Sequence, residues 1–297
     1  MSNLYRAHVM SLNSTVVAGL VTQDLARNIV ISSPLTDGSV HPKNTAILSS
    51  SPQHTITSLD IDTMITLCGS GGGAIAGVCN WYDAKIAATG GAKTAGSTHT
   101  KGNYATGYIK PDSLTVGAQT VAQMSATLMG LGTSEPVTIT ADSALAGTDG
   151  TPKQYGMGPL AINGTTYTQI TDVNINFGVT ETTDVSDGNI GPRDAKTQSA
   201  KVVVTITTTD MDALQDAVDG GIALDGSDGF VLYLRQRSQD GTAYLTGTNH
   251  IKIEILDGII VPESNSGNEA KTSTFRIEGR YESQNPVVLT SGEALPS

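Results

Sequence analysis

Residues 37–44 read DGSVHPKN, and residues 187–194, 150 positions further along the chain, read DGNIGPRD. Both stretches place an Asp-Gly turn, an aliphatic residue, a proline and a basic residue in the same order. The match extends without a gap over residues 12–62 and 162–212, and eleven of these 51 positions are identical. Composition alone would give roughly three or four identities. The sequence therefore indicates an internal repeat.

The repeat continues towards the end of each copy. Pro111-Asp112-Ser113 matches Pro262-Glu263-Ser264, now at an offset of 151. A chain of 297 residues also exceeds the usual length of one domain, about 100 to 200 residues. We predict a tandem pair of domains, residues 1–155 and residues 156–297. The alternative is that two Thr-rich strands resemble each other by composition only.

Alternating apolar and polar residues predict strands in the second copy. One strand is expected between Thr166 and Thr180, before the Asp187-Gly188 turn, and a second from Val202 to Thr207. Three more are expected at Phe230–Leu234, Ile251–Ile255 and Thr272–Glu278. The predicted fold is mainly β, a sandwich or barrel in each copy. Long Thr-rich strands with few aromatic residues favour pairing of their open edges with a neighbour.

Each copy is also expected to contain one short helix. In the second copy Thr209 or Asp210 can cap the helix, apolar residues recur at helical spacing, and Gly220-Gly221 can end it. The apolar residues are Met211, Leu214 and Val218. The first copy offers Asp60, Met64 and Leu67 before Gly69.

The charge argues against a protein that grips nucleic acid. The formal net charge is −11 and the pI is about 4.7, whereas phosphate binding requires clustered Lys and Arg. Up to residue 155 there are 8 basic and 9 acidic residues, and from residue 156 there are 9 and 19. Cys68 and Cys79 are too few for a disulfide framework and are expected to be reduced core residues. The chain shows no secretory signal and no membrane helix, so we expect a soluble protein made in the cytoplasm.

Neither the histidines nor the Gly-rich segments show a catalytic or metal-binding pattern. The five histidines are scattered and show no zinc spacing: His8, His41, His54, His99 and His250. Residues 69–77 read GSGGGAIAG, but this run is expected to follow a helix and lead into a strand, the reverse of a phosphate-binding loop. We interpret it, and the Asp/Gly-rich loop 219–229, as helix-to-strand connections.

Two carboxylate clusters remain as alternatives. Asp219, Asp225 and Asp228 could bind calcium, although the twelfth position counted from Asp225 is Gln236 rather than Glu. A second alternative is an enzyme whose paired carboxylates are Asp60/Asp62 and Asp210/Asp212, although Asp at a helix start is more often a cap. We predict no catalytic, cofactor-binding or metal-binding residue, no cofactor, and a protein that is not an enzyme.

The expected architecture resembles the tail tube (major tail) proteins of siphophages. The resemblance rests on the alternating strand before Asp187-Gly188, the loop containing Pro192, the strand Val202 to Thr207 leading into the helix Asp210 to Val218, and the closing strands up to Glu282. In such proteins a β-sandwich carries one flanking helix and a long loop that reaches the next ring. The resemblance is one of architecture rather than of a catalytic motif.

The resemblance implies a structural virion protein that polymerises into the hollow tube through which phage DNA is ejected. A duplicated chain is expected to form trimeric rings with pseudo-sixfold symmetry rather than hexameric rings. Expected partners are further copies of the chain, a tape-measure protein and tail terminator or tip proteins, with DNA passing an acidic lumen without specific binding. The expected location is the virion, with no membrane association. The alternative is another assembling shell, baseplate or surface-layer structural protein.

Overall fold

The strands of the protein form two series, one in each half of the chain. The structure is a computed structural model, and it describes residues 4–34, 40–42, 45–87, 91–146, 150–209, 222–224, 229–266, 272–280 and 287–296. In this part of the chain the first half contains β1 (Leu4–Leu12), β2 (Thr15–Val17), β3 (Leu20–Ala26), β4 (Ile29–Ser32), β5 (Ala46–Ser50), β6 (Gln53–Ser58), α1 (Ile61–Cys68), β7 (Gly73–Ile75), β8 (Cys79–Ile86), β9 (His99–Tyr104), β10 (Thr106–Gly117), β11 (Gln123–Leu131) and β12 (Val137–Ser143). The second half contains β13 (Tyr155–Ile162), β14 (Thr165–Tyr167), β15 (Ile170–Asn176), β16 (Val179–Asp184), β17 (Asp194–Ala200), β18 (Val203–Thr208), β19 (Ile222–Ala223), β20 (Phe230–Gln236), β21 (His250–Ile255), β22 (Gly258–Ser266), β23 (Thr272–Gly279) and β24 (Val287–Glu293). The predicted mainly β fold is confirmed.

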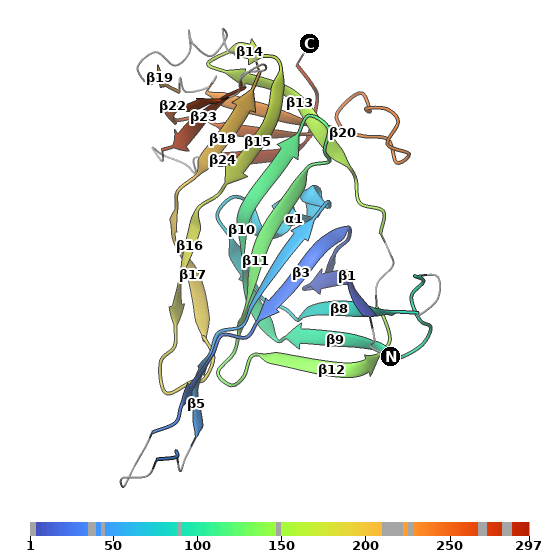
Figure 1. Cartoon of the computed structure of the whole chain (residues 1–297), viewed down its shortest axis with the longest axis vertical. Coiled ribbons are helices and arrows are strands. Elements are labelled where there is room, and N and C mark those ends of the chain that lie inside the picture. Colours follow the sequence, from blue (N-terminus) through green and yellow to red (C-terminus); the bar gives the residue numbers. More distant parts are fainter. Residues whose placement is uncertain are drawn as a thin grey trace.

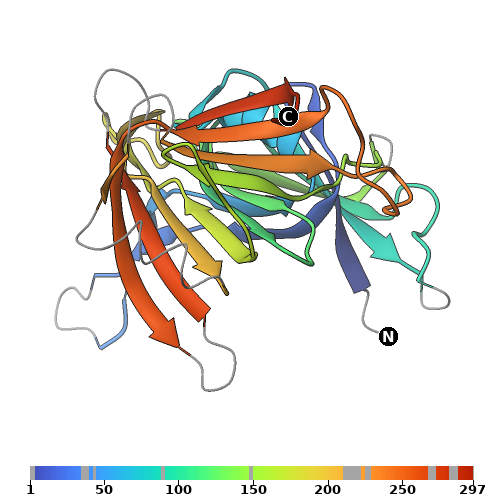
Figure 2. The same ribbon diagram turned by 90° about the horizontal axis from the view of Figure 1, so that it is seen from above.

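The strands form one large sheet and two smaller ones. The ten-stranded sheet has the order β19-β22-β23-β18-β15-β10-β11-β6-β3, with β7 also paired to β10. A five-stranded sheet, β12-β9-β8-β1-β2, belongs to the first half, and another, β14-β13-β20-β21-β24, belongs to the second. Two hairpins, β4–β5 and β16–β17, extend from the large sheet (Figure 1). Figure 2 shows β22 and β23 of the large sheet lying apart from β20, β21 and β24, the other layer of the second half.

The two halves pair their strands in the same way. Strand β1 pairs with β2 and β8 as β13 pairs with β14 and β20, and β6 pairs with β3 and β11 as β18 pairs with β15 and β23. Backbone detail recurs as well, because Asn13 and Asn163 have φ values of 47° and 49° in equivalent turns. Strand β13 begins at Tyr155, next to the predicted boundary. The division into domains 1–155 and 156–297 stays a prediction.

The apolar core is continuous between the halves. One cluster of buried side chains includes residues of both five-stranded sheets and of the inner face of the ten-stranded sheet. In the first half an aromatic group lies at its centre: the His54 ring meets Trp81 edge-on, with ring centroids 4.8 Å apart, and Trp81 lies 4.8 Å from Tyr104. Gly130 makes room for it, since a Cβ there would lie 2.3 Å from the Tyr104 ring.

Helix α1 confirms the short helix predicted in the first half. It buries Ile61, Met64 and Cys68, and Gly69 follows with φ 53°. The predicted side-chain cap is wrong, because Asp60 makes no capping hydrogen bond. Ser58 Oγ instead accepts a bond from the Asp60 N–H at 2.9 Å, which holds the Asp60 backbone at the helix start. The helix predicted over 210–218, and Gly220-Gly221 after it, lie outside the described residues.

The strand predicted between Thr166 and Thr180 is wrong as a single element. The segment contains β14, β15 and the start of β16, separated at Gln169 (φ 58°) and Gly178 (φ 56°). Positive φ is incompatible with a continuous strand, so the chain turns at both positions while the alternation of buried side chains continues in β15. The other predicted strands are confirmed as β18, β20, β21 and β23.

Candidate functional site

The two halves meet where β10 of the first half pairs with β15 of the second. The register runs from Ser113↔Asn176 to Gly117↔Asp172, and Phe177 N–H donates to the Asp112 carbonyl at 3.1 Å. The other end of β10 pairs with β7 along the same edge, from Gly107 to Ile109. One end of the β10 edge is therefore covered by a strand of the first half, and the other end is covered by a strand of the second half.

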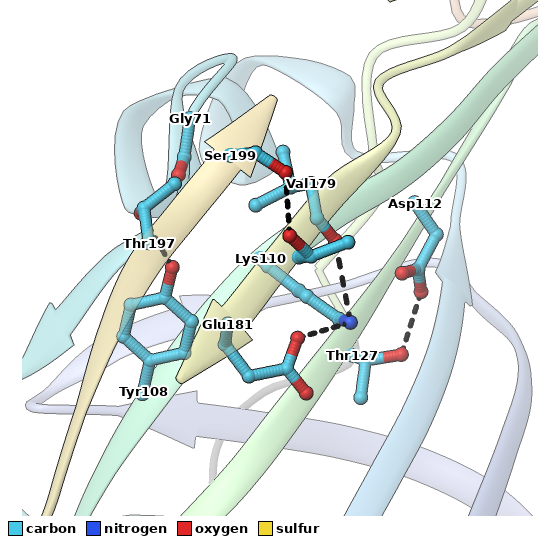
Figure 3. Close-up of polar contacts among 10 residues, drawn as sticks. Gly71, Tyr108, Lys110, Asp112, Thr127, Val179, Glu181, Thr197 and Ser199 are labelled. Atoms are coloured by element: carbon cyan, nitrogen blue, oxygen red, sulfur yellow. Dashed lines mark hydrogen bonds and ion pairs between the residues drawn. The ribbon is translucent and has the colours of Figure 1, made fainter. Parts of the chain in front are cut away.

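Hairpin β16–β17 lies against β10 and completes this contact (Figure 3). Lys110 Nζ lies 2.5 Å from Glu181 Oε2 and 3.4 Å from the Val179 carbonyl oxygen. Tyr108 OH lies 2.7 Å from Thr197 Oγ1. Because the Thr197 hydroxyl donates to the Gly71 carbonyl at 2.7 Å, the Tyr108 hydroxyl is the donor to Thr197. We call this whole contact, the β10–β15 pairing with hairpin β16–β17, the internal joint.

The internal joint is polar and largely shielded from solvent. The Lys110 and Glu181 side chains are only 18% and 13% exposed. Asp112 bulges out of β10 and accepts a hydrogen bond from Thr127 Oγ1 at 2.6 Å, and burial raises the pKa of its carboxyl. The pair of opposite charges is needed at this place because a lone buried charge would be strongly unfavourable.

The Asp-Gly…Pro motif of the second half also binds the first half. Asp187 and Gly188 form the predicted turn, with φ values of 61° and 71°. Beyond the turn Ile190 N–H donates to the Thr133 carbonyl at 3.2 Å, and Gly132 N–H donates to the Pro192 carbonyl at 2.8 Å. In the first copy of the motif, Asp37, Gly38, Lys43 and Asn44 lie outside the described residues.

The ten-stranded sheet ends in two edges that match the two sides of the internal joint. Strand β22 repeats β10: Pro262 is followed by a bulge at Glu263, as Pro111 is followed by one at Asp112. Strand β3 occupies the place of β15 in the first half. Among the described residues β22 pairs with β19 only at Ile259 and Ile260, and β3 pairs with β6 alone. One end of the molecule thus presents a β10-like edge and the other a β15-like edge.

The face of the ten-stranded sheet that points away from the core is polar. Alternate side chains of β3, β6, β15, β18 and β23 lie on it, and most of them are Thr or Asn. Its charged residues include Asp24, Asp172, Arg276 and Glu278. Arg276 is paired with Glu278 at 3.1 Å and with Glu263 at 3.2 Å. Acidic groups therefore outnumber basic groups on this face.

The histidines do not converge on one site. His54 is buried against Trp81, and burial lowers its pKa to about 4. His99 and His250 are buried at equivalent places, where Nδ1 of each accepts a backbone N–H bond, from Lys85 at 3.0 Å and from Gln236 at 3.2 Å. The buried rings of His99 and His250 therefore have a structural role, as acceptors of backbone hydrogen bonds. His8 lies 2.9 Å from Lys93, and His41 is exposed.

The remaining candidate residues have structural contacts. Cys68 and Cys79 are buried free thiols, as predicted, and burial raises the pKa of each to about 12. Asp62 Oδ2 accepts from Tyr155 OH and from Lys153 Nζ, both at 2.8 Å, so it links α1 to the start of the second half. The Gly-rich run 69–77 connects α1 to β7 and β8, as predicted.

The acidic loop and the second carboxylate pair fall on residues that the structure does not describe. Asp210, Asp212, Asp219, Asp225 and Asp228 all lie outside the described residues. Within the described residues no three His, Cys, Asp or Glu side chains lie close enough to hold a metal ion. A cavity of about 240 Å³ near His8 and Lys93 is open to solvent. No helix in the described part of the chain is long and apolar enough to span a membrane.

Comparison with known proteins adds no relative. No protein-family model matches the sequence, and no curated protein is significantly similar to it.

The internal joint was missed by sequence reasoning, although one signal pointed to it. The echo of Pro111-Asp112-Ser113 in Pro262-Glu263-Ser264 marks the bulge of β10 and β22.

Proposed function

We propose that this protein is a structural subunit that polymerises into a hollow tube, the tail tube of a long-tailed bacteriophage, with residues 1–155 and 156–297 as two tail-tube-like repeats. The observation that supports the proposal is the internal joint. A β10 edge and a β15 edge already pair within the chain. The equivalent strands, β22 and β3, lie towards the two ends of the same sheet, where β19 covers β22 only at Ile259 and Ile260 among the described residues. Exposed strand edges of this kind recruit another chain.

Repetition of the internal joint between copies gives a closed ring or an open helix. The contact is head-to-tail, so every added copy presents a new β22 edge, and the ring closes when the rotations sum to a full turn. Each chain supplies two repeats and one internal joint. Three chains would then give six similar joints, three within chains and three between them. This is the pseudo-sixfold trimer that the sequence resemblance implies.

The polar face of the large sheet suits the lumen of a tube. Its side chains are short and hydroxylated, and its acidic residues outnumber its basic ones. Such a surface repels phosphate groups and offers no Lys or Arg cluster for DNA to bind. DNA would pass without specific binding. A tape-measure protein inside the tube and terminator or tip proteins at its ends are the expected partners in the virion.

Electron microscopy tests the proposal directly. The purified chain would be imaged in negative stain over a range of concentrations, and end-on views would be averaged rotationally. Hollow rings or tubes with three chains and six similar lobes are expected. Flat sheets or closed shells would favour the alternative of a shell, baseplate or surface-layer protein. Monomers at every concentration would refute assembly altogether.

Cysteine pairing tests the predicted contact between β22 and β3. In the internal joint Ser113 lies opposite Asn176. The equivalent residues are Ser264 of β22 and Ala26 of β3, which have no partner strand on their outer side among the described residues. Opposed residues in antiparallel strands have Cα atoms about 4.5 to 5.5 Å apart, a separation that suits a disulfide. Under mild oxidation, Ser264→Cys combined with Ala26→Cys should give covalent trimers on a non-reducing gel.

The internal joint supplies the matched control. Ser113→Cys combined with Asn176→Cys should form a disulfide within one chain, so the mass on the gel should not change. The native thiols should not interfere, because Cys68 and Cys79 are buried and their pKa values are about 12. Cross-linking in the control but only monomers in the test pair would contradict the pairing of β22 with β3.

A further inference from the structure

Hairpin β4–β5 is the first-half counterpart of the hairpin in the internal joint. The two hairpins share one register and one irregularity: Ile31 lies opposite Ile47 as Glu181 lies opposite Thr197. The Glu181 and Thr197 side chains make the polar contacts with β10. Ile31 and Ile47 are 60% and 46% exposed, on a hairpin that extends beyond the sheets in Figure 1. The same positions are thus polar and docked in one half but apolar and exposed in the other.

Strand β22 shows the complementary change. The shared register with β11 and β23 places Ile259 at the position of Tyr108 and Val261 at the position of Lys110. Ile259 is 45% exposed. Tyr108 and Lys110 hold the hairpin of the internal joint through polar atoms. The residues at the equivalent positions of β22 are both aliphatic. Two exposed apolar surfaces, at opposite ends of the large sheet, occupy equivalent sides of one kind of contact.

We propose that hairpin β4–β5 of one copy docks on β22 of a second copy, with Ile31 against Val261 and Ile47 against Ile259. This inference rests on the proposed assembly and specifies its interface. The partner that binds β22 is a second copy of this chain. If β3 of that copy pairs with β22 in the register of the internal joint, these four side chains come together. The contact between copies is then an apolar version of the internal joint.

The internal joint is polar and the contact between copies is apolar because only the internal joint connects two parts of the same chain. The two halves of one chain are tethered, so their joint needs little association free energy and can use an ion pair and hydrogen bonds. Separate copies lose translational and rotational freedom when they associate, and burial of apolar surface supplies the compensating free energy. Ile31, Ile47 and Ile259 are the exposed side chains that provide that surface.

The same difference also prevents the joints from being exchanged. A second-half hairpin placed on β22 would bring Glu181 against Val261 instead of a lysine. The cation opposite Val261, Arg276 of β23, is already paired with Glu263 and Glu278, so Glu181 would gain no partner of its own. A first-half hairpin placed on β10 would cover Lys110 with Ile31 and leave the ammonium group without its carboxylate. Buried unpaired charges are strongly unfavourable, so each hairpin selects its own strand.

Charge substitution and rescue test the contact. Ile31→Glu and Val261→Lys should each raise the critical concentration for assembly at least about tenfold, because each places one charge in an apolar contact. The double variant Ile31→Glu/Val261→Lys reproduces the Lys110–Glu181 pair of the internal joint and should return the critical concentration to within about threefold of the wild type. Sedimentation of assembled protein at increasing concentration measures all three.

Ile31→Glu/Val261→Glu is the matched control, since it carries two substitutions but like charges, and it should not assemble better than either single variant. Thermal melting of each variant below its critical concentration should match the wild type, which shows that the fold is intact. The inference fails if Ile31→Glu assembles normally or if the opposite-charge double is no better than the singles. It stands, while the tube proposal fails, if copies associate through this contact with the predicted rescue but form no hollow tube.

Discussion

The buried imidazole of His54 should make the stability of the protein depend on pH. His54 is 1% exposed and packs edge-on against Trp81, and burial lowers its pKa from 6.5 to about 4. In the unfolded chain the ring is solvated and titrates near 6.5. Below pH 6.5 the unfolded chain therefore binds a proton that the folded chain does not. Acidification stabilises the unfolded state relative to the folded state.

The size of the effect follows from the shift. The two pKa values differ by roughly 2.5 units, and each unit corresponds to about 1.4 kcal/mol, so the free energy of unfolding should fall by about 3 kcal/mol. The loss begins as the pH falls below 6.5, grows down to about pH 4, and does not increase further below that value.

A substitution isolates this contribution. His54→Leu keeps a similar side-chain volume and removes the titrating group. Neither nitrogen of the His54 ring has a hydrogen-bond partner among the described residues, so the substitution leaves no described polar group unpaired. Urea unfolding of both proteins from pH 7.5 to pH 4, below the critical concentration for assembly, gives the difference in free energy of unfolding at each pH. The half-buried carboxyls of Asp83 and Asp112, whose pKa values are raised by burial, and the His250 imidazole, whose pKa is lowered by burial, titrate in both proteins, so their contributions cancel.

We expect the wild type to lose about 3 kcal/mol more than His54→Leu between pH 7 and pH 4. Two parallel profiles would refute the reasoning, because they would mean that the imidazole is protonated in the folded state or is not buried there. At neutral pH the variant should be at least as stable as the wild type, since the neutral ring makes no hydrogen bond with the described part of the chain that the substitution would remove.

Two further predictions concern the core and the internal joint. Gly130→Ala should lower the free energy of unfolding by about 2 kcal/mol in urea titrations, because the added Cβ would overlap the Tyr104 ring; an unchanged value would mean that the aromatic group can shift. Lys110→Met should lower it by about 3 kcal/mol by leaving Glu181 buried without a cation. The double variant Lys110→Met/Glu181→Met should recover most of that loss, and a double variant as unstable as the single would show that the ion pair is not the reason.

The Asp-Gly motif is the clearest sign of the predicted repeat because of its turn chemistry. The Asp-Gly turn at 187–188 requires positive φ at both residues, which few residue types adopt, so the motif remains recognisable where the flanking strands do not. Alternation predicted β18, β20, β21 and β23 for a similar reason, since each has one buried face.

The contacts that define the candidate site could not be predicted in the same way. Lys110 and Glu181 lie 71 positions apart, and neither stretch shows a local signal of the other. A proline in β10 and in β22 also argues against a strand when each is considered alone. The bulge next to each proline resolves the conflict, but it becomes visible only once the partner strand is known. The break at Gln169 was not predicted, because positive φ at a glutamine has no sequence signature.

The internal joint has a consequence for the kinetics of assembly. In the proposed ring of three chains, half of the joints would exist before any two molecules meet, because the internal joint forms when the chain folds. The tether keeps the partner repeat at a high effective concentration, so this half does not depend on how much protein the cell has made. Nucleation then requires three molecules to meet rather than six, and the rate of ring formation should rise with a lower power of protein concentration than it would for unlinked repeats.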